Sequence, residues 1–439
     1  MSPIGVALVA LYVVLVCTPA ALVTLLGPPR YVWLYAVGLN AALTGFMILV
    51  LQVVLAARWR WASQPFGLDI VLRFHRKMAV FGACLLIAHP FLLAAGRGNW
   101  HLIYSLDQPW NIWLGRVALL LVIVNVLLSV FRVQLRQTFE RWRLLHGVIG
   151  VLLLGSAWTH SWFTGPDLRL TALQILWIAL AALVVLVFAH HRFIRPRLLR
   201  RGAYRVVGVH QEIENVWTIE LQPPDGRSRE SYAPGQFHFL TLHRDRDLPH
   251  EEHHFTISSS PSRPDAVSST IKAVGDFTST IGRTKPGDTA SVHGAFGRFS
   301  YRFHTDERDL VFIAGGIGVT PLMSMLRCMH DTGEDIRVTL LYANKDDASI
   351  VFRQELESIA SGDQPRLTLV HVLSKPPEDW AGESGHIDRA MLERHVPEPS
   401  GKTFYICGPP PRIKATISNL KSMGVRDRDI RMEIFSLVD

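Results

Sequence analysis

The stretches HRKMAVFGACLLIAH (residues 75–89) and HGVIGVLLLGSAWTH (residues 146–160) each begin and end on a histidine within an apolar run. In both stretches the two histidines are fourteen residues apart. On an α-helix this spacing is a rise of ~21 Å and about four turns less ~40°, so both imidazoles lie on nearly one face. Because a hydrocarbon core is ~30 Å thick, each helix would hold one imidazole near each leaflet. Two such helices side by side present two stacked pairs of ligand nitrogens.

The apolar residues are concentrated before about residue 193, although 49% of the whole 439-residue chain is hydrophobic. Six runs there are long enough to span a membrane and are bounded by Arg, Pro, Gly or Trp. We expect spans at residues 5–27, 32–57, 75–96, 112–131, 144–164 and 170–193. The first lacks a basic n-region and a small-residue cleavage site, so we interpret it as a retained helix and not as a signal peptide.

Basic residues are distributed unevenly among the connections between these runs. Fifteen Lys and Arg precede the third and fifth runs or follow the sixth, whereas the opposite connections carry four. The positive-inside rule therefore predicts that both termini and everything after the sixth span are cytoplasmic, in an integral plasma (bacterial inner) membrane protein. The same topology explains much of the net charge of +8, so a nucleic-acid partner is not implied. The cysteines at positions 17, 84, 328 and 407 show no iron–sulfur or disulfide pattern.

The four histidines are predicted to be axial ligands of two b-type haems. By depth, His75 pairs with His146 near the cytoplasm, and His89 with His160 near the outer face. An imidazole in lipid needs a partner, and haem iron supplies one. The alternatives are four hydrogen-bonded packing residues, or a histidine relay in a non-enzymatic, proton-coupled transporter.

The remainder of the chain predicts two further domains after a linker. We expect residues 190–202 to leave the membrane as a basic hinge, broken at Pro196 and Gly202. Short alternating runs from residue 204 to 305 predict an antiparallel β-barrel. From residue 306 to 439 a strand, a Gly-rich turn and a helix recur, which predicts a βαβ nucleotide domain with a parallel sheet. The expected domains are thus 1–195, 204–305 and 306–439.

Four segments in these domains carry residues suited to nucleotide cofactors. In HHFTISSS (253–260) an aromatic ring with hydroxyl neighbours can lie against an isoalloxazine ring. In IKAVGDFT (271–278) Gly275 permits a tight turn, and Thr278 would begin a helix whose free amides suit a pyrophosphate. VFIAGGIGVTP (311–321) is a Gly-rich turn between strand and helix, although it lacks the G-x-G-x-x-G fingerprint. FYICGPP (404–410) ends a predicted strand. Taken alone, this segment favours a buried structural role for Cys407 over a role in binding a cofactor. The alternative for the first two segments is that they are ordinary turns of a β-barrel with no cofactor.

Together these residues resemble the ferric reductase and NADPH oxidase superfamily over essentially the whole chain, and its prokaryotic members most. The resemblance implies a transmembrane flavocytochrome b, in which a six-span helical bundle precedes a cytoplasmic ferredoxin–NADP reductase-type module. It assigns FAD to His253, Phe255, Thr256, Ser258, Thr278 and Phe435, and NADPH or NADH to Gly315, Gly316, Gly318, Thr320, Pro321, Gly408 and Pro409. Lys272 and Gly275 are further candidate cofactor-binding residues. It makes Cys407, Phe435 and Ser258 the catalytic residues beside the nicotinamide and flavin. The sequence departs from the family pattern after Phe435, because four more residues follow that aromatic.

The implied activity is electron transfer from cytoplasmic NAD(P)H through FAD and two haems to an acceptor outside. The His-x-Phe-Thr pattern at residues 253–256 looks like the oxidase branch, which favours oxygen and superoxide over a ferric chelate. Lys345 and Arg353 favour NADPH, whereas the carboxylates at 346 and 347 oppose its phosphate. Haem propionates would meet basic residues at positions 73, 76, 141 and 143 inside and 97 outside. Arg97 and His101 shape either an acceptor site or an interfacial belt. No protein partner is implied.

Overall fold

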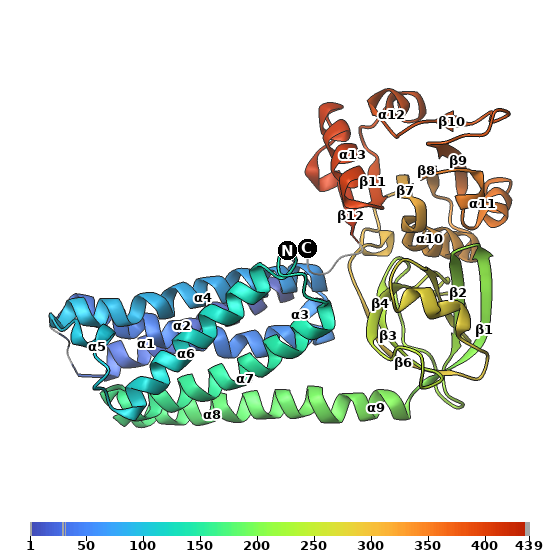
Figure 1. Cartoon of the computed structure of the whole chain (residues 1–439). Helices are drawn as coiled ribbons and strands as arrows, with labels where there is room; N and C mark the ends of the chain where they lie inside the picture. Colours follow the sequence, from blue (N-terminus) through green and yellow to red (C-terminus); the bar gives the residue numbers. More distant parts are fainter. Residues whose placement is uncertain (1, 29, 31, 435–439) are drawn as a thin grey trace. The chain divides into compact units, whose positions relative to one another are not determined.

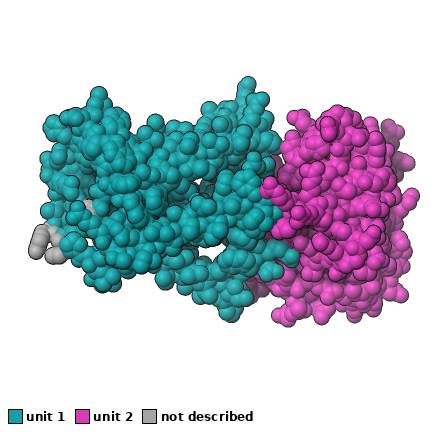
Figure 2. Space-filling model, turned by 90° about the horizontal axis from the view of Figure 1, so that it is seen from below, with its two compact units in different colours: residues 1–195 teal, residues 196–439 magenta. Residues whose placement is uncertain are grey.

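A computed structural model describes residues 2–28, 30 and 32–434. The chain divides into two compact units, residues 1–195 and residues 196–439, drawn in teal and magenta in Figure 2. We call them the helical unit and the sheet unit and describe each by itself.

Six long apolar helices dominate the helical unit and confirm the predicted bundle (Figure 1). The helices are α1 (Pro3–Leu26), α2 (Trp33–Ala56), α3 (Arg60–Ser63), α4 (Leu68–Arg97), α5 (His101–Tyr104), α6 (Trp110–Val130), α7 (Phe139–Thr164), α8 (Thr171–Ala189) and α9 (Arg195–Arg201). A 3₁₀ turn (Pro166–Arg169) precedes α8, and a π turn (His190–Ile194) joins α8 to α9. Their outward side chains are largely exposed Leu, Val, Ile and Phe, as expected of a surface that meets lipid.

The packing inside the helical unit pairs the helices. α2 packs along α4 and α6 packs along α7, while Phe46 of α2 stacks on the buried Trp177 of α8 with ring centres 5.3 Å apart. Small residues allow the close approach of α2 and α4: a Cβ on Gly38 would lie 2.9 Å from the side chain of Leu92. Between other helices the unit is more open, and gaps pass through it in Figure 2.

The expected hinge at residues 190–202 is wrong. Helix α8 continues through the π turn into α9 and ends only at Arg201, so Pro196 lies inside a helical segment of 31 residues. In the π turn the amide of Arg195 donates to the carbonyl of His190, five residues earlier. This wider turn accommodates the proline ring, which in a regular turn collides with the carbonyl four residues before it. Gly202 does follow the end of the helix.

The first part of the sheet unit is an antiparallel, six-stranded sheet in the order β4-β3-β6-β1-β2-β5. Its strands are β1 (Tyr204–Ile213), β2 (Val216–Gln222), β3 (Phe237–His243), β4 (Glu252–Thr256), β5 (Val267–Lys272) and β6 (Thr289–Phe296). The amide of Ser258 donates to the carbonyl of Ser268 at 2.8 Å, which joins the two edge strands β4 and β5 into a barrel. Alternating apolar residues such as Val206, Ile219 and Leu240 fill its interior.

The second part is a six-stranded parallel sheet in the order β10-β9-β8-β7-β11-β12. It comprises β7 (Asp309–Gly315), β8 (Arg337–Asn344), β9 (Arg366–Leu373), β10 (Glu383–Ser384), β11 (Thr403–Cys407) and β12 (Ile430–Glu433), with helices α10 (Val319–Thr332), α11 (Arg353–Ala360), α12 (Arg389–His395) and α13 (Pro410–Ser422). Strands β8, β9 and β10 follow one another on one side of β7, and the next strand in the chain, β11, lies on the other side of β7. This reversal between β7 and β11 is the position at which α/β sheets bind ligands. The predicted fold class is confirmed in both parts.

Candidate functional site: paired histidines and a dinucleotide cavity

Two helices carry the four predicted ligands, His75 and His89 on α4 and His146 and His160 on α7. The structure brings them together as the spacing predicts. The rings of His75 and His146 have centres 6.4 Å apart and planes inclined by 63°. His89 lies close enough to His160 for an electrostatic interaction. The chain thus builds two imidazole pairs between helices that pack mainly on other neighbours.

Hydrogen bonds fix the orientation of three of these imidazoles. The Nδ1 atom of His89 lies 2.9 Å from the carbonyl oxygen of Gly38, and that of His160 lies 2.7 Å from the carbonyl oxygen of Asn111. A carbonyl only accepts, so each Nδ1 must carry the proton and donate it. In each ring Nε2 is then the bare nitrogen with the lone pair that a metal requires.

Ser129 of α6 imposes the same tautomer on His146. Its hydroxyl donates to the carbonyl oxygen of Asn125 at 2.7 Å and accepts from the indole N–H of Trp142 at 3.2 Å. The Ser129 hydroxyl proton lies in the bond to Asn125, so the Ser129 oxygen can only accept from Nδ1 of His146, which lies 3.2 Å away. His146 must be the donor, and its Nε2 is bare as well.

A glycine makes room for one ligand. A Cβ built on Gly115 of α6 would lie 2.5 Å from the ring of His160, closer than any real Cβ contact. Only a residue without a side chain lets α6 approach this imidazole so closely.

The basic residues expected near the propionates have different surroundings. Arg73 pairs with Asp69 at 2.6 Å, and Arg97 donates to the hydroxyl of Tyr35 and lies over its ring at 4.3 Å. Arg76, Arg141 and Arg143 are exposed. In the connection between α4 and α6, His101 is exposed and packs beside Tyr104. Arg116 donates hydrogen bonds to the carbonyls of Leu102 and Ser105 in the same connection.

The two predicted flavin segments come together on the barrel. His253 of β4 stacks on Phe277 with ring centres 4.1 Å apart, and Phe255 lies nearly parallel to Phe277 at 6.2 Å. Thr278 begins a 3₁₀ turn (Thr278–Arg283), as the sequence predicts. Its hydroxyl accepts from the amides of Val274 and Gly275, which closes the loop. The two segments therefore meet in a cluster formed by the rings of His253, Phe255 and Phe277.

The loop after β4 is fastened to the nucleotide domain. Arg327 of α10 donates to the carbonyl of Ser258 at 2.7 Å and forms a two-point ion pair with Glu355 of α11. Ser324 donates to the carbonyl of Ser259, also at 2.7 Å. Ser258 is fully buried, and Thr256 nearly so. These contacts hold the two parts of the sheet unit together at the residues predicted to surround the flavin ring.

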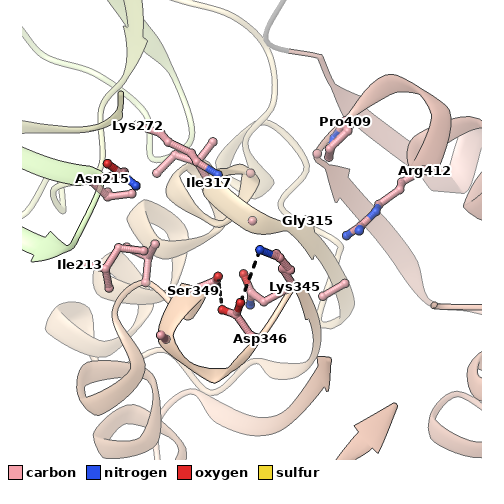
Figure 3. A pocket seen from close by; sticks show the side chains of 18 of the residues that line it. Ile213, Asn215, Lys272, Gly315, Ile317, Lys345, Asp346, Ser349, Pro409 and Arg412 are labelled. Carbon is pink, nitrogen blue, oxygen red and sulfur yellow. Dashed lines mark hydrogen bonds and ion pairs between the residues drawn. The ribbon is translucent and has the colours of Figure 1, made fainter. Parts of the chain in front are cut away.

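A cavity of about 920 Å³ opens at the carboxyl ends of the parallel strands (Figure 3). It gathers predicted residues from three segments: Lys272, Gly315, Gly316, Gly318, Gly408 and Pro409. Figure 3 shows Arg412 extending from α13 across from the hairpin of Ile213 and Asn215. Thr320 and Pro321 are buried in the first turn of α10 and do not line it. The size and position suit a dinucleotide.

The Gly-rich turn and the Cys-Gly-Pro turn pack directly on each other. A Cβ on Gly318 would lie 2.4 Å from the carbonyl oxygen of Cys407, so a side chain has no space there. Gly316 has φ of +55°, which favours glycine. Cys407 is buried, and this burial raises the pKa of its thiol well above the ordinary value. The negative charge of the nearby Glu433 is a second, smaller cause of the same increase. The sulfur is therefore a neutral packing atom at neutral pH. Phe435 lies outside the described residues.

Sequence reasoning missed several contributors to these sites. Ser129, Trp142 and Gly115 act across helices, and Arg327, Asn344 and Arg412 reach the sheet-unit sites from elements distant in the chain. A local pattern cannot reveal such contacts. Arg412 alone carried a signal, because it lies two residues after the end of FYICGPP, in the first turn of a helix.

Three family models match consecutive parts of the chain. A ferric reductase like transmembrane component matches residues 41–157, an FAD-binding domain matches residues 204–292, and an oxidoreductase NAD-binding domain matches residues 312–417. With the six apolar helices, the first match identifies an integral membrane protein.

Curated relatives match part of the chain. NADH-cytochrome b5 reductase 2 of Mus musculus is 34% identical over 32% of this chain and 57% of its own length. The glycine betaine monooxygenase reductase subunit of Chromohalobacter salexigens is 35% identical over 44% of this chain and 53% of its own length. The chain thus spans little more than half of these relatives. Among solved structures, the cytochrome b5 reductase domain of Ulva prolifera nitrate reductase aligns with a TM-score of 0.48 and 22% identity, over 53% of this chain and 97% of that domain.

Proposed function

Because the chain has the ferric reductase and NADPH oxidase-type architecture, we propose that it carries electrons from NAD(P)H through FAD and two haems b to an acceptor across the membrane. The sheet unit then lies in the cytoplasm, as the basic connections between spans favour. The flavin, when bound, would supply the conversion of a two-electron hydride into single electrons, and haem iron held by the paired histidines would supply their one-electron relay.

The observation that carries this proposal is the arrangement of the imidazoles. His89, His146 and His160 each hold the Nδ1 proton in a hydrogen bond and keep Nε2 bare. Every neutral imidazole has one unprotonated nitrogen, so the bare Nε2 atoms permit metal ligation, and the distance between the paired rings is what favours it. Two metal–imidazole bonds of about 2 Å each, added to two ring radii, would separate the ring centres by roughly 6 Å at most. The rings of His75 and His146 are 6.4 Å apart, which fits bis-histidine ligation of one iron.

Residues of the sheet unit are proposed to bind the nicotinamide dinucleotide and the flavin. Gly315, Gly316 and Gly408 let the backbone approach the dinucleotide, and Lys272 and Arg412 bring positive charge to its phosphates. His253, Phe255, Thr256, Gly275 and Thr278 form the flavin surface, with Ser258 held beneath it and Phe435 proposed to cover the ring. Cys407 packs beside the nicotinamide as an uncharged group.

NADPH remains the proposed donor, with NADH as a second substrate. Lys345 lines the cavity, whereas Arg353 is bound to Asp347 and Glu357 and is not among its lining residues. Of the two carboxylates at 346 and 347, Asp346 lines the cavity; it accepts from Ser349 and lies 3.9 Å from Lys345 (Figure 3). We expect Lys345→Ala to raise KM for NADPH and leave KM for NADH nearly unchanged. Equal effects on both nucleotides would contradict this assignment.

Oxygen is the proposed acceptor, giving superoxide, and a ferric chelate is the alternative. Both suit an outer-sphere electron from a haem without an open position. The pattern at residues 253–256 favours oxygen by resemblance alone. Cytochrome c reduction measured with and without superoxide dismutase, and with and without ferric chelate, separates the two acceptors.

Replacement of His89 tests the electron path. In membrane vesicles we expect His89→Leu to leave bleaching of the flavin by NADPH intact and to abolish reduction of an acceptor on the opposite side. His101→Leu, which alters an exposed imidazole of the loop after α4, should retain both haems. Outward electron transfer that survives His89→Leu would refute the relay. A reduced-minus-oxidised spectrum without haem bands would instead favour the transporter.

A further inference from the structure

Three buried hydroxyls and one carboxylate form a continuous chain on the face of the barrel beneath the nucleotide domain. Ser258 meets Thr270 at 2.9 Å, Thr270 meets Thr218 at 2.8 Å, and Thr218 donates to the carboxylate of Glu212 at 2.5 Å. The three hydroxyl-bearing residues are 0%, 4% and 6% exposed, whereas Glu212 is half-buried at the end of β1.

Proton accounting gives this chain a direction. A carboxylate accepts, so the proton of Thr218 is committed to Glu212. Thr218 must then accept from Thr270, and Thr270, having given its own proton, accepts from Ser258. The only other acceptor in hydrogen-bond range of the Ser258 hydroxyl among the described residues is the carbonyl of Ser268, at a longer 3.2 Å. All three protons point toward Glu212.

The chain runs beside the dinucleotide cavity. Across β2 and β5, Val216 pairs with Lys272, and Thr218 pairs with Thr270. Residues two apart on a strand face the same side, so the hydroxyl pair lies on the same face as Val216 and Lys272, which line the cavity. Glu212 precedes Ile213 and Glu214 at the rim of that cavity. The other end, Ser258, lies in the predicted flavin segment.

We propose that Ser258, Thr270, Thr218 and Glu212 form a proton relay from the flavin site to water. The proposal rests on the proposed function, whose stoichiometry demands such an exit. Oxidation of NAD(P)H to NAD(P)⁺ releases two electrons and one proton. The electrons leave singly toward the haems, so the proton stays in the sheet unit. Each hydroxyl passes its own proton to the next oxygen and receives one from behind, and Glu212 delivers the last to water.

The test compares Thr270→Val, which keeps the shape but removes the hydroxyl, with Thr270→Ser, which restores it. Stopped-flow absorbance of the full-length protein separates bleaching of the flavin by NADPH from recovery when an acceptor is added. We expect Thr270→Val and Glu212→Gln to bleach at the wild-type rate but to recover about a hundredfold more slowly, at the low end of proton-transfer contributions. The solvent deuterium isotope effect on recovery should rise, and Thr270→Ser should return both values toward wild type.

Ser269→Ala is the matched control, because Ser269 lies on the same strand but bonds to His238 on the opposite face. It should leave the recovery rate and the isotope effect unchanged. Wild-type recovery in Thr270→Val would overturn the relay, and so would equal slowing in Thr270→Val and Thr270→Ser. A wild-type protein whose flavin NADPH does not bleach would refute the proposed function itself.

Discussion

At the scale of single residues, one hydroxyl proton decides the chemistry of an imidazole. Ser129 gives its proton to the carbonyl of Asn125, so His146 can only donate to it. A hydrogen bond from Nδ1–H raises the basicity of a ligating imidazole and stabilises the oxidised metal. The outer-pair histidines donate instead to backbone carbonyls at 2.9 and 2.7 Å. The two proposed haem sites therefore differ in a property that a substitution can change.

We predict that Ser129→Ala raises the midpoint potential of the inner haem and leaves the outer one unchanged. Removal of the acceptor weakens donation by His146, which favours the reduced iron. Ser156→Ala is the matched control, since the hydroxyl of Ser156 in α7 donates to the carbonyl of Leu152 in its own helix. A potentiometric titration of the haem absorbance measures both potentials. Two unmoved potentials, or two potentials that shift together, would contradict the assignment.

A second residue-scale prediction concerns the contact between the two nucleotide turns. Gly318→Ala places a methyl group 2.4 Å from the Cys407 carbonyl, so the turns must separate. We expect KM for NADPH to rise about tenfold or more, since positioning errors near 1 Å cost rates heavily, while the haem content is unchanged. Gly362→Ala, whose Cβ meets nothing closer than 3.4 Å, should behave as wild type. An unchanged KM in Gly318→Ala would show that the cavity does not hold the nucleotide.

At the scale of elements, the barrel contains a buried histidine with a consequence for acid stability. His238 of β3 is 1% exposed and bonds to Ser269 at 2.7 Å, and burial lowers its pKa from 6.5 to about 3. The unfolded chain binds a proton near pH 6.5 and the folded barrel does not. The stabilising contribution of the neutral ring is therefore complete above pH 6.5 and is lost as the pH falls from 6.5 toward 3.

We accordingly predict that acid destabilises the wild-type barrel more steeply than it destabilises His238→Leu. The difference in slope should approach about 1.4 kcal/mol per pH unit below pH 6. Unfolding of the full-length protein, followed by release of flavin fluorescence at several pH values, measures both slopes. Parallel slopes would show that His238 does not govern acid stability.

The elements also show which parts of the fold a sequence can predict. Apolar runs located all six spans, because burial in lipid requires about 20 apolar residues. The starts of two spans were misplaced: α4 begins at Leu68 and α7 at Phe139, ahead of the expected 75 and 144. Charged residues of both signs interrupt the starts of these helices (Asp69 and Arg73 in α4, Glu140 and Arg141 in α7), so the apolar run begins later than the helix does. Pro196 was likewise misjudged, because the π turn that tolerates it has no local sequence signal.

At the scale of the whole molecule, the spacing of residues within one helix could be predicted from the sequence, whereas the contacts between helices could not. The fourteen-residue interval placed four histidines on matching faces of α4 and α7. The partners that orient them come from α2 and α6, which no pattern near the histidines reveals. The same holds in the sheet unit, where the Gly-rich and Cys-Gly-Pro turns were recognised separately and only the fold brings them to one cavity.

We propose that this chain binds two irons between α4 and α7, and its haem content is the decisive measurement. A pyridine haemochrome assay on the purified, fully loaded protein should give two b-type haems per polypeptide. The same assay should give one per polypeptide for either His89→Leu or His146→Leu. Wild-type protein with one haem, or with none, would contradict the account.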